Sequence, residues 1–382
     1  MKKILALCLV LFLFVPMCAS AEGVIKIGVF EPVTGENGGG GFQEILGIRY
    51  ANSLVPSVEV GGETYQIELV EVDNQSDKTA AVSAAQSLMA SNVVAVLGSY
   101  GSGVSIAAGE IFADAGVPAI GCSCTNPQVT LGNDFYFRVC FLDPFQGTVM
   151  ANYAFQEGAK KAAVITQLGD DYSSGLGNFF LKAYKELGGE IVSQEQFQTN
   201  QTDFKAILTN IKAAAPDVIF APSSIATAPL LIKQARELGI TSTIMAGDTW
   251  ENVTIIENAG ADAEGVVLST FFDEADTAAA EFVTGYKAFL NATPEYLKKN
   301  GGDGVAAVSA LSYDAYMVAI EAIKQANSIE PQAIRDALTT VSMPGVTGAI
   351  SFDENGDAKK DMAYIKVVED GAFKFLKTVT IG

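Results

Sequence analysis

The sequence lacks histidine entirely and has few basic residues. Among its 382 residues, 24 lysines and arginines are opposed by 44 aspartates and glutamates, which gives a formal net charge of -20. Without histidine, Ser-His-Asp and Cys-His catalysis and all histidine-ligated metal sites are excluded. Nucleic acids and anionic membrane surfaces are bound by basic surfaces, so we expect neither as a partner.

Long apolar runs are also missing beyond the N-terminal region. The longest candidate, Val305 to Ile323, contains Asp314 and Glu321 and therefore indicates a helix of a soluble protein. The length of the chain predicts two or more domains, because single hydrophobic cores stop growing at roughly 250–300 residues.

Residues 1–21 have the pattern of a cleavable signal peptide. Two lysines precede an apolar core at 4–15, and residues 19–21 supply the small side chains that signal peptidase requires. We expect cleavage after this segment and a periplasmic protein. A lipoprotein acylated at Cys18 is the alternative, but residues 15–17 lack the small side chains usual before a lipidated cysteine.

Cysteine is scarce in the predicted mature chain, which keeps Cys122, Cys124 and Cys140. An odd number allows at most one internal disulfide. A C-x-C pair with a third cysteine could bind a metal, but no fourth ligand is evident. Buried free thiols, or one bridge from Cys122 or Cys124 to Cys140, are the favoured interpretations, and we expect no metal and no cofactor.

Short β-branched runs alternate with helical patterns through two similar halves of the chain. The first half predicts strands at 24–30, 65–72, 93–97 and 117–120, with helices at 42–53, 77–90 and from about 104 to 115. The second half predicts strands at 162–166, 190–194, 217–221 and 242–246, with helices at 175–187, 202–214 and 228–238. Such alternation implies parallel sheets covered on both faces, and therefore an α/β fold of two Rossmann-like lobes with a ligand cleft between them.

The remaining segments complete the predicted lobes. Helices are expected at 276–290, 305–326 and 332–340, a glycine-rich loop at 35–41, and a hairpin of strands 349–352 and 363–368 joined by the acidic turn 353–357. That turn lacks the twelfth-position glutamate of a calcium loop, so we interpret it as an ordinary turn. We expect one lobe from residues 22–143 with about 272–346, and the other from 144–271 with about 347–382.

Ligands of open α/β sheets bind beyond the carboxyl ends of the strands. This rule nominates six loops that contain no lysine or arginine: 31–41, 98–103, 121–125, 167–172, 222–226 and 247–250. If the two lobes face one another, these loops would enclose a small ligand between them.

Two of these loops have complementary chemistry. The loop at 98–103 leads into a helix with Ser102 near its start, where backbone amides and the helix dipole favour an anion; a tight turn capped by serine is the alternative, and we favour the ligand role. Ser123 and Thr125 add hydroxyls at the next strand end. Asp248 lies in another loop beside Trp250; it could cap the following segment, or hold an ammonium group across the cleft. The combination predicts a site for a zwitterion.

The arrangement resembles the type I periplasmic binding proteins, most closely the leucine/isoleucine/valine-binding family of ABC importers, over essentially the whole mature chain. The resemblance rests on six blocks in order: Leu97–Ser102, Cys124–Thr130, Phe137-Arg138 with Asp143–Gly147, Asp170–Gly175, Gln234–Gly239 and Ala263–Gly265.

The resemblance implies a role for each candidate side chain. Ser102, Ser123 and Thr125 would bind the α-carboxylate of an amino acid, Tyr172 would close from the other lobe, and Asp248 would bind the α-ammonium. It further implies a monomer that delivers a branched-chain or other aliphatic amino acid to a membrane ABC permease.

The sequence departs from the family around the ligand side chain. Where the family usually places an aromatic residue in the first loop, this chain has glycines at 38–41, and where it tends to have tyrosine after the second lobe's third strand, it has Ser223-Ser224. Tyr100 and Trp250 would refill part of this space. We therefore include Tyr100, Gly101, Ser224 and Trp250 among the candidate ligand-binding residues.

Other classes of function are less well supported. A glycosidase would need a converging carboxylate pair, but Asp170, Asp171 and Asp248 follow different strands and no aromatic sugar platform accompanies them. An amide- or urea-binding protein of the same fold would need no ammonium partner. A ligand-sensing module would need only the same closing cleft.

Overall fold

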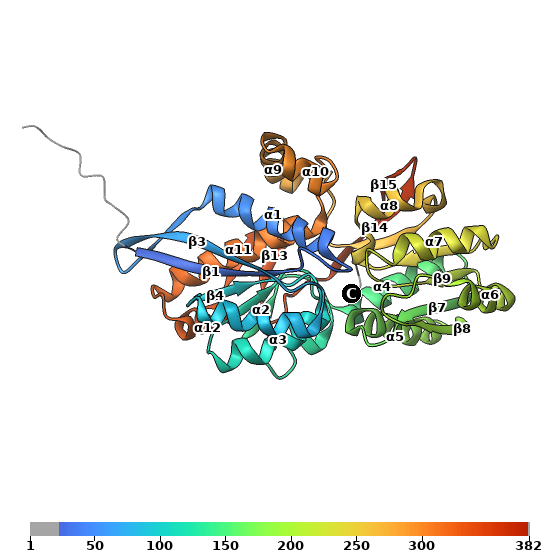
Figure 1. Ribbon diagram of the computed structural model, residues 1–382, viewed down its shortest axis with the longest axis horizontal. Helices are drawn as coiled ribbons and strands as arrows, with labels where there is room; N and C mark the ends of the chain where they lie inside the picture. Colours follow the sequence, from blue (N-terminus) through green and yellow to red (C-terminus); the bar gives the residue numbers. More distant parts are fainter. Residues whose placement is uncertain (1–22, 381–382) are drawn as a thin grey trace, which may run out of the picture.

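The computed structural model describes residues 23–380, so the predicted targeting segment lies outside the described residues. The described chain forms two α/β lobes that lie end to end (Figure 1). Each lobe has a largely parallel sheet covered by helices, which confirms the predicted fold class.

The first lobe has a six-stranded sheet in the order β2-β3-β1-β4-β5-β6. Its strands are β1 (Gly23–Glu31), β2 (Ser57–Val60), β3 (Glu63–Asp73), β4 (Ala95–Leu97), β5 (Ala119–Gly121) and β6 (Tyr136–Arg138). Helices α1 (Gly38–Leu54) and α11 (Ala307–Ala326) pack together on one face, and α2 (Lys78–Ala90) and α3 (Ser102–Asp114) on the other (Figure 1). The lobe also has α9 (Ala280–Ala292), α10 (Pro294–Asn300), α12 (Pro331–Leu338) and the 3-10 turns η1 (Pro127–Val129) and η4 (Thr277–Ala279).

The second lobe has a seven-stranded sheet in the order β15-β14-β11-β10-β9-β7-β8. Its strands are β7 (Lys161–Gln167), β8 (Glu190–Phe197), β9 (Val218–Phe220), β10 (Thr243–Ala246), β11 (Val267–Thr270), β14 (Met362–Glu369) and β15 (Ala372–Thr380). Its helices are α4 (Asp143–Gln156), α5 (Asp171–Glu186), α6 (Lys205–Ala214), α7 (Ala228–Glu237) and α8 (Val253–Ala259), with 3-10 turns η2 (Asp248–Trp250) and η3 (Gly260–Ala263).

The central strands are buried on both faces, which explains their continuous apolar runs. All residues of β4, β5, β9 and β6 are buried, and β1 pairs in parallel with both β3 and β4. Parallel strands share one direction, so their carboxyl ends lie along one edge of each sheet. The loops predicted to bind a ligand follow these ends.

The expectation of a glycine-rich loop at 35–41 was wrong in part, because α1 begins at Gly38. The first turn of this helix packs closely against neighbouring segments, which requires residues without a side chain. A Cβ atom at Gly40 would lie 2.3 Å from the ring of Tyr100, and one at Gly41 would lie 2.2 Å from the carbonyl oxygen of Pro32. The glycines therefore let the start of α1 approach the neighbouring loops.

The predicted hairpin of residues 349–352 and 363–368 was also wrong. Strand β13 (Gly348–Ser351) pairs with β12 (Ser342–Gly345) in a small separate sheet, whereas β14 lies between β11 and β15. The acidic turn between them is tied to the first lobe instead. Asp357 Oδ1 accepts hydrogen bonds from Arg138 Nε at 2.5 Å and from Thr130 Oγ1 at 2.9 Å.

Three segments connect the lobes: 139–142 before α4, 271–276 after β11, and 352–361 before β14. We propose that the lobe boundaries lie at these crossovers. The third is placed somewhat later than the sequence suggested, because the β12–β13 sheet is bound to α11: Asp314 accepts hydrogen bonds from the backbone amides of Val346 and Thr347, both at 2.9 Å.

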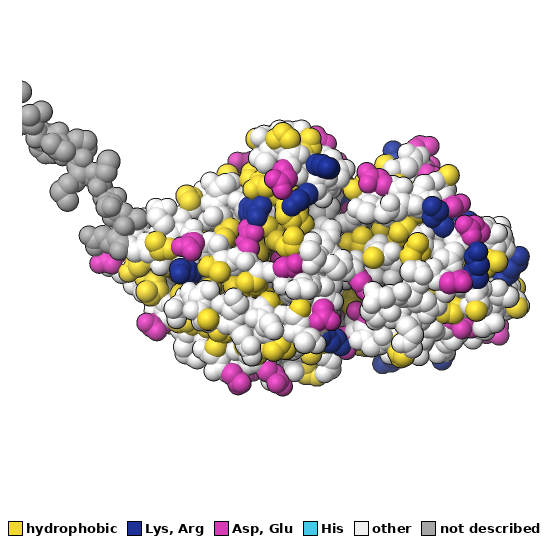
Figure 2. All heavy atoms as spheres, in the orientation of Figure 1, with side chains coloured by type: hydrophobic (Ala, Val, Ile, Leu, Met, Phe, Trp, Pro, Cys, Tyr) yellow, Lys and Arg dark blue, Asp and Glu magenta, His cyan; other side chains and the backbone are white. Residues whose placement is uncertain are grey.

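Charged side chains are dispersed over the face drawn in Figure 2, where lysines and arginines lie in small groups among acidic residues. Within residues 23–380, no helix is long and apolar enough to cross a membrane.

Candidate functional site

The two lobes touch along the carboxyl ends of their strands, so the predicted cleft is closed. Lys78 forms an ion pair with Asp171 across it, with 2.7 Å between Nζ and Oδ2. Tyr100 OH donates to the carbonyl oxygen of Thr249 at 3.2 Å, and Asn126 Nδ2 donates to the carbonyl oxygen of Asp171 at 2.7 Å. Side chains of the first lobe thus bind the loops of the second.

The candidate anion site lies at the start of α3. Gly101 is the N-cap in extended conformation, and Ser102 is the first helical residue rather than the cap. The amides of the first turn have no partner within the helix and point toward the cleft end of the lobe. Ser102 Oγ accepts a hydrogen bond from the amide of Asn126 at 3.2 Å. Since it accepts that bond, its own proton remains available to a ligand.

The other two predicted hydroxyls differ in their partners. Thr125 Oγ1 is fully buried and has no hydrogen-bond partner among the described residues. Ser123 Oγ, in contrast, donates to Glu44 Oε1. The hydroxyl protons of Ser102 and Thr125 are therefore available to a ligand carboxylate, whereas that of Ser123 is occupied by a glutamate that the sequence analysis did not nominate.

The candidate cation site is built around Asp248, which is 3% exposed in the η2 turn after β10. Its Oδ1 accepts hydrogen bonds from Gln146 Nε2 at 2.9 Å and from Tyr172 OH at 3.0 Å. Burial raises the pKa of Asp248 to about 6, and these two donors oppose the rise. Asp248 is therefore ionised at neutral pH, with Oδ2 not used by either donor.

Gly247 allows this arrangement, because a Cβ atom there would lie 2.5 Å from Tyr172 OH and 3.0 Å from Gln146 Nε2. Gln146 is a site residue that the candidate list missed. The sequence did contain a signal for Gln146, since this residue lies in the Asp143–Gly147 block that carried the family resemblance. Gln146 Nε2 also contacts Ser269 Oγ at 3.0 Å, which fixes the orientation of its amide.

The predicted residues around the ligand side chain are engaged with the protein. The Tyr100 ring packs against Gly40, and Trp250 is 1% exposed with its Nε1 donating to the carbonyl oxygen of Ser223 at 3.1 Å. Ser224 Oγ donates to Thr227 Oγ1 at 3.0 Å. Tyr100 and Trp250 are therefore almost fully buried in this closed form, and Ser224 supports the start of α7.

Buried polar atoms without partners gather at the cleft. Of eight such side-chain atoms in the described residues, six belong to residues of this region: Glu31 Oε1, Glu44 Oε2, Thr125 Oγ1, both Asp143 oxygens and Gln146 Oε1. Burial raises the pKa of Asp143 to about 8. Leaving buried polar atoms unpaired is costly, so those of Thr125, Asp143 and Gln146 make the region suited to a polar ligand.

The carboxylates considered for glycoside hydrolysis do not act together. Asp170 caps α5 by accepting from the amide of Ser173 at 2.6 Å, Asp171 pairs with Lys78, and Asp248 binds Gln146 and Tyr172. Each therefore has a separate partner in the fold.

All three described cysteines are buried free thiols, so the structure contains no bridge from Cys140 to Cys122 or Cys124. Cys140 Sγ instead lies 3.7 Å from the carbonyl oxygen of Cys124. Burial raises the pKa of each thiol, which keeps all three protonated and unreactive.

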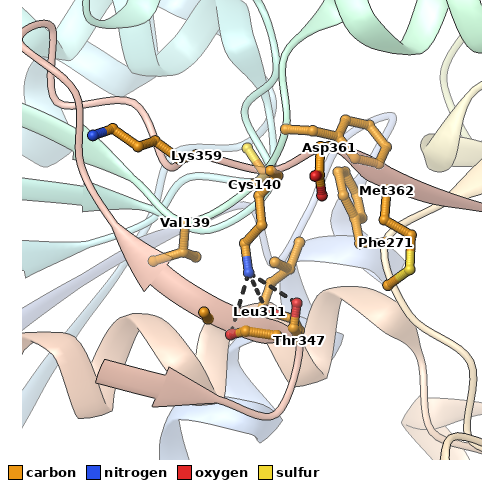
Figure 3. A pocket seen from close by; sticks show the side chains of 12 residues that line it. Val139, Cys140, Phe271, Leu311, Thr347, Lys359, Asp361 and Met362 are labelled. Atoms are coloured by element: carbon orange, nitrogen blue, oxygen red, sulfur yellow. Dashed lines mark hydrogen bonds between the residues drawn. The ribbon is translucent and has the colours of Figure 1, made fainter. Parts of the chain in front are cut away.

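A separate cavity of about 140 Å³ lies where the three crossovers pass, lined by residues that include Val139, Phe271 and Met362 (Figure 3). Lys360 donates there to the carbonyl oxygen of Thr347 at 2.8 Å. None of the predicted ligand-binding residues lines this cavity, so it is distinct from the cleft.

Comparisons with known proteins agree with this architecture. A family model described as periplasmic binding protein matches residues 24–372. The Leu/Ile/Val-binding protein homolog 1 of Brucella abortus (strain 2308) is 30% identical over 347 residues, which cover 89% of each chain.

Two solved structures are similar over nearly the whole chain. The leucine-binding protein LivK from Thermotoga maritima is 35% identical with a TM-score of 0.84, covering 94% of this chain and 99% of the other. The branched-chain amino acid transporter substrate-binding protein LivJ from Streptococcus pneumoniae, in complex with isoleucine, is 31% identical with a TM-score of 0.82 and the same coverage. The chain is therefore a member of the periplasmic binding protein family and is similar to substrate-binding proteins of branched-chain amino acid ABC transporters.

Proposed function

We propose that this protein captures a free amino acid by closing its two lobes, and that the amino acid is branched-chain or otherwise aliphatic. The observation that carries the proposal is that hydroxyls and helix amides of one lobe and a buried carboxylate of the other lie at the same closed cleft. Ser102 and Thr125 offer free hydroxyl protons beside the start of α3, and Asp248 offers a buried carboxylate held by the second lobe.

Each subsite suits one charge of a zwitterion. Helix amides and hydroxyls stabilise a carboxylate without any basic residue. A buried carboxylate stabilises an ammonium, which would otherwise be very costly to desolvate. Tyr100 and Trp250 offer the aromatic surface that an aliphatic side chain would contact.

The relatives support the same ligand class, since the Streptococcus pneumoniae protein was solved with isoleucine and the Thermotoga maritima protein is named a leucine-binding protein. We infer that this protein acts outside the cytoplasm as a monomer and delivers its ligand to a membrane ABC permease. It performs no catalysis in this role, because closing a cleft around an unchanged ligand needs only differential contacts in the closed state.

Mass spectrometry of ligand released by denaturing freshly purified protein tests the proposal. We expect leucine, isoleucine, valine or another aliphatic amino acid, and calorimetric titration of ligand-depleted protein should then show saturable binding of the same compound. Small-angle scattering should show a smaller radius of gyration once that ligand is bound.

Other results would favour a different function. Release of urea or an amide, with no amino acid bound in the titration, would favour the amide- or urea-binding alternative. A bound amino acid combined with no uptake by the permease encoded beside the protein would favour ligand sensing. Size-exclusion chromatography with light scattering separates a monomer from a dimer.

A further inference from the structure

Two glutamates of the first lobe lie close together near the candidate anion site. Glu31 ends β1 and Glu44 lies in α1, and neither side chain is exposed to solvent. Side-chain oxygens of both and Cys122 Sγ all lie within 4.8 Å of one another. Two buried carboxyl groups at this separation cannot both be ionised without strong repulsion.

Within residues 23–380, no lysine or arginine is among the groups that act most strongly on the two carboxyls. Cys124 disfavours ionisation of Glu31 and Asp248 disfavours that of Glu44, whereas hydrogen bonds from the amide of Tyr100 to Glu31, and from Ser123 and Cys122 to Glu44, favour the ionised forms. Burial and mutual proximity raise the pKa of Glu31 well above its usual range, and burial raises the pKa of Glu44 to about 7.

The pair is connected to the ligand site on two sides. Glu44 Oε1 accepts the hydroxyl proton of Ser123, beside Thr125. Glu31 Oε2 accepts from the amide of Tyr100 at 2.8 Å, and Tyr100 OH in turn binds the carbonyl oxygen of Thr249 in the other lobe. These contacts link the pair to the anion site through Ser123 and to the other lobe of the closed cleft through Tyr100.

We propose that Glu31 and Glu44 retain one shared proton. This proton prevents the pair from carrying two negative charges next to the ligand's carboxylate, which makes the two glutamates positioning residues of the ligand site. The remaining unpaired atoms, Glu31 Oε1 and Glu44 Oε2, fit this assignment, because a proton held between two carboxyl groups satisfies one oxygen of each.

The consequence is a coupling between protonation and binding. A second negative charge on the pair would repel a carboxylate held at Ser102 and Thr125, since Coulomb interactions are strong in a desolvated site. Affinity for the ligand should therefore fall when the shared proton is lost.

Glu44→Gln is the informative variant. Its amide nitrogen can donate permanently to Glu31 in place of the shared proton, and its amide oxygen can still accept from Ser123. Calorimetric titration with leucine, or with the amino acid identified above, should give affinities within about threefold of the wild type at pH 6. As pH rises to 8.5, the wild-type affinity should weaken by up to about tenfold per pH unit once the proton is lost, whereas the variant stays constant. Glu71→Gln, which changes an exposed acid of the same lobe, should follow the wild type.

Two measurements on the ligand-free protein separate this inference from the proposed function on which it rests. At pH 7, infrared difference spectra between the wild type and Glu44→Gln should contain the carbonyl band of a protonated carboxylic acid that the variant lacks, whereas the band of the buried Asp143 carboxyl is common to both proteins and cancels. The melting temperature of the wild type should fall relative to that of the variant as pH rises, because a raised carboxyl pKa means stability that is present at low pH and lost at high pH.

The proposal would be overturned by a missing carboxylic acid band or by an unchanged difference in melting temperature between pH 6 and 8.5. It would also be overturned by a variant whose affinity follows the wild-type pH profile. Stoichiometric metal in the purified protein by elemental analysis, lost in Glu44→Gln, would assign the cluster with Cys122 to a metal instead.

Discussion

Asp248→Asn should change ligand affinity and apoprotein stability in opposite directions. The variant keeps an acceptor for Gln146 and Tyr172 but removes the charge that faces the ligand. Losing one partner of a buried charge pair costs about 2–5 kcal/mol. The affinity for the amino acid should therefore fall roughly 30- to several-thousand-fold.

The same substitution relieves a cost in the ligand-free protein. A difference of one in pKa corresponds to about 1.4 kcal/mol, so raising the pKa of Asp248 from 3.8 to about 6 costs the folded state about 3 kcal/mol at pH 8. Because the folded-state pKa is the higher one, this cost is complete above pH 6 and disappears as the pH falls toward 4. Asp248→Asn should stabilise the apoprotein at pH 8 and have little effect near pH 4.

Urea unfolding of the apoprotein at both pH values and calorimetric titration at pH 8 measure the two effects. Asp171→Asn is the matched control, since Asp171 lies at the same cleft but its side chain is 37% exposed in its pair with Lys78; it should lose no more than about fivefold in affinity. The reasoning is refuted if Asp248→Asn binds within about threefold of the wild type. It is equally refuted if the variant is less stable than the wild type at pH 8.

Three further substitutions test other parts of the molecule. Ser102→Ala should weaken ligand binding roughly 5- to 30-fold in calorimetry, the effect of one hydrogen bond to a charged group; unchanged affinity would place the carboxylate elsewhere. Lys78→Gln should lower affinity by less than about 1 kcal/mol, and the difference should vanish in high salt because the Asp171 pair is partly exposed; a salt-independent loss would contradict this. Arg138→Met should lower the free energy of urea unfolding by about 3–5 kcal/mol, because Asp357 remains as an unpaired buried charge; a stable variant would show that this pair contributes little.

Local patterns in the sequence predicted many of the strands and helices in the two halves, although they missed β2, β6, α4, α8 and β11. Asp77 shows why local patterns work: it begins the predicted helix 77–90 and caps α2 by accepting from the amides of Thr79 and Ala80 at 2.9 and 2.8 Å. Capping depends on residues adjacent in sequence. The carboxyl ends of parallel strands likewise follow from the alternation alone, which is why the loops that contain Ser102, Thr125, Tyr172 and Asp248 could be nominated from the sequence.

Only the tertiary structure determines which polar atoms within those loops have hydrogen-bond partners. Glu44 reads as an ordinary polar residue in a helix, and only the packing of α1 against the cleft buries it beside Glu31 and Ser123. Gln146 reaches Asp248 across 102 residues of sequence. The run of glycines at the start of α1 predicts a loop from the sequence alone. Only the structure shows that Tyr100 and Pro32 approach these glycines closely. Secondary structure is set largely by neighbours along the chain, whereas burial, proton sharing and hydrogen-bond partners are set by segments that meet only when the lobes fold and close.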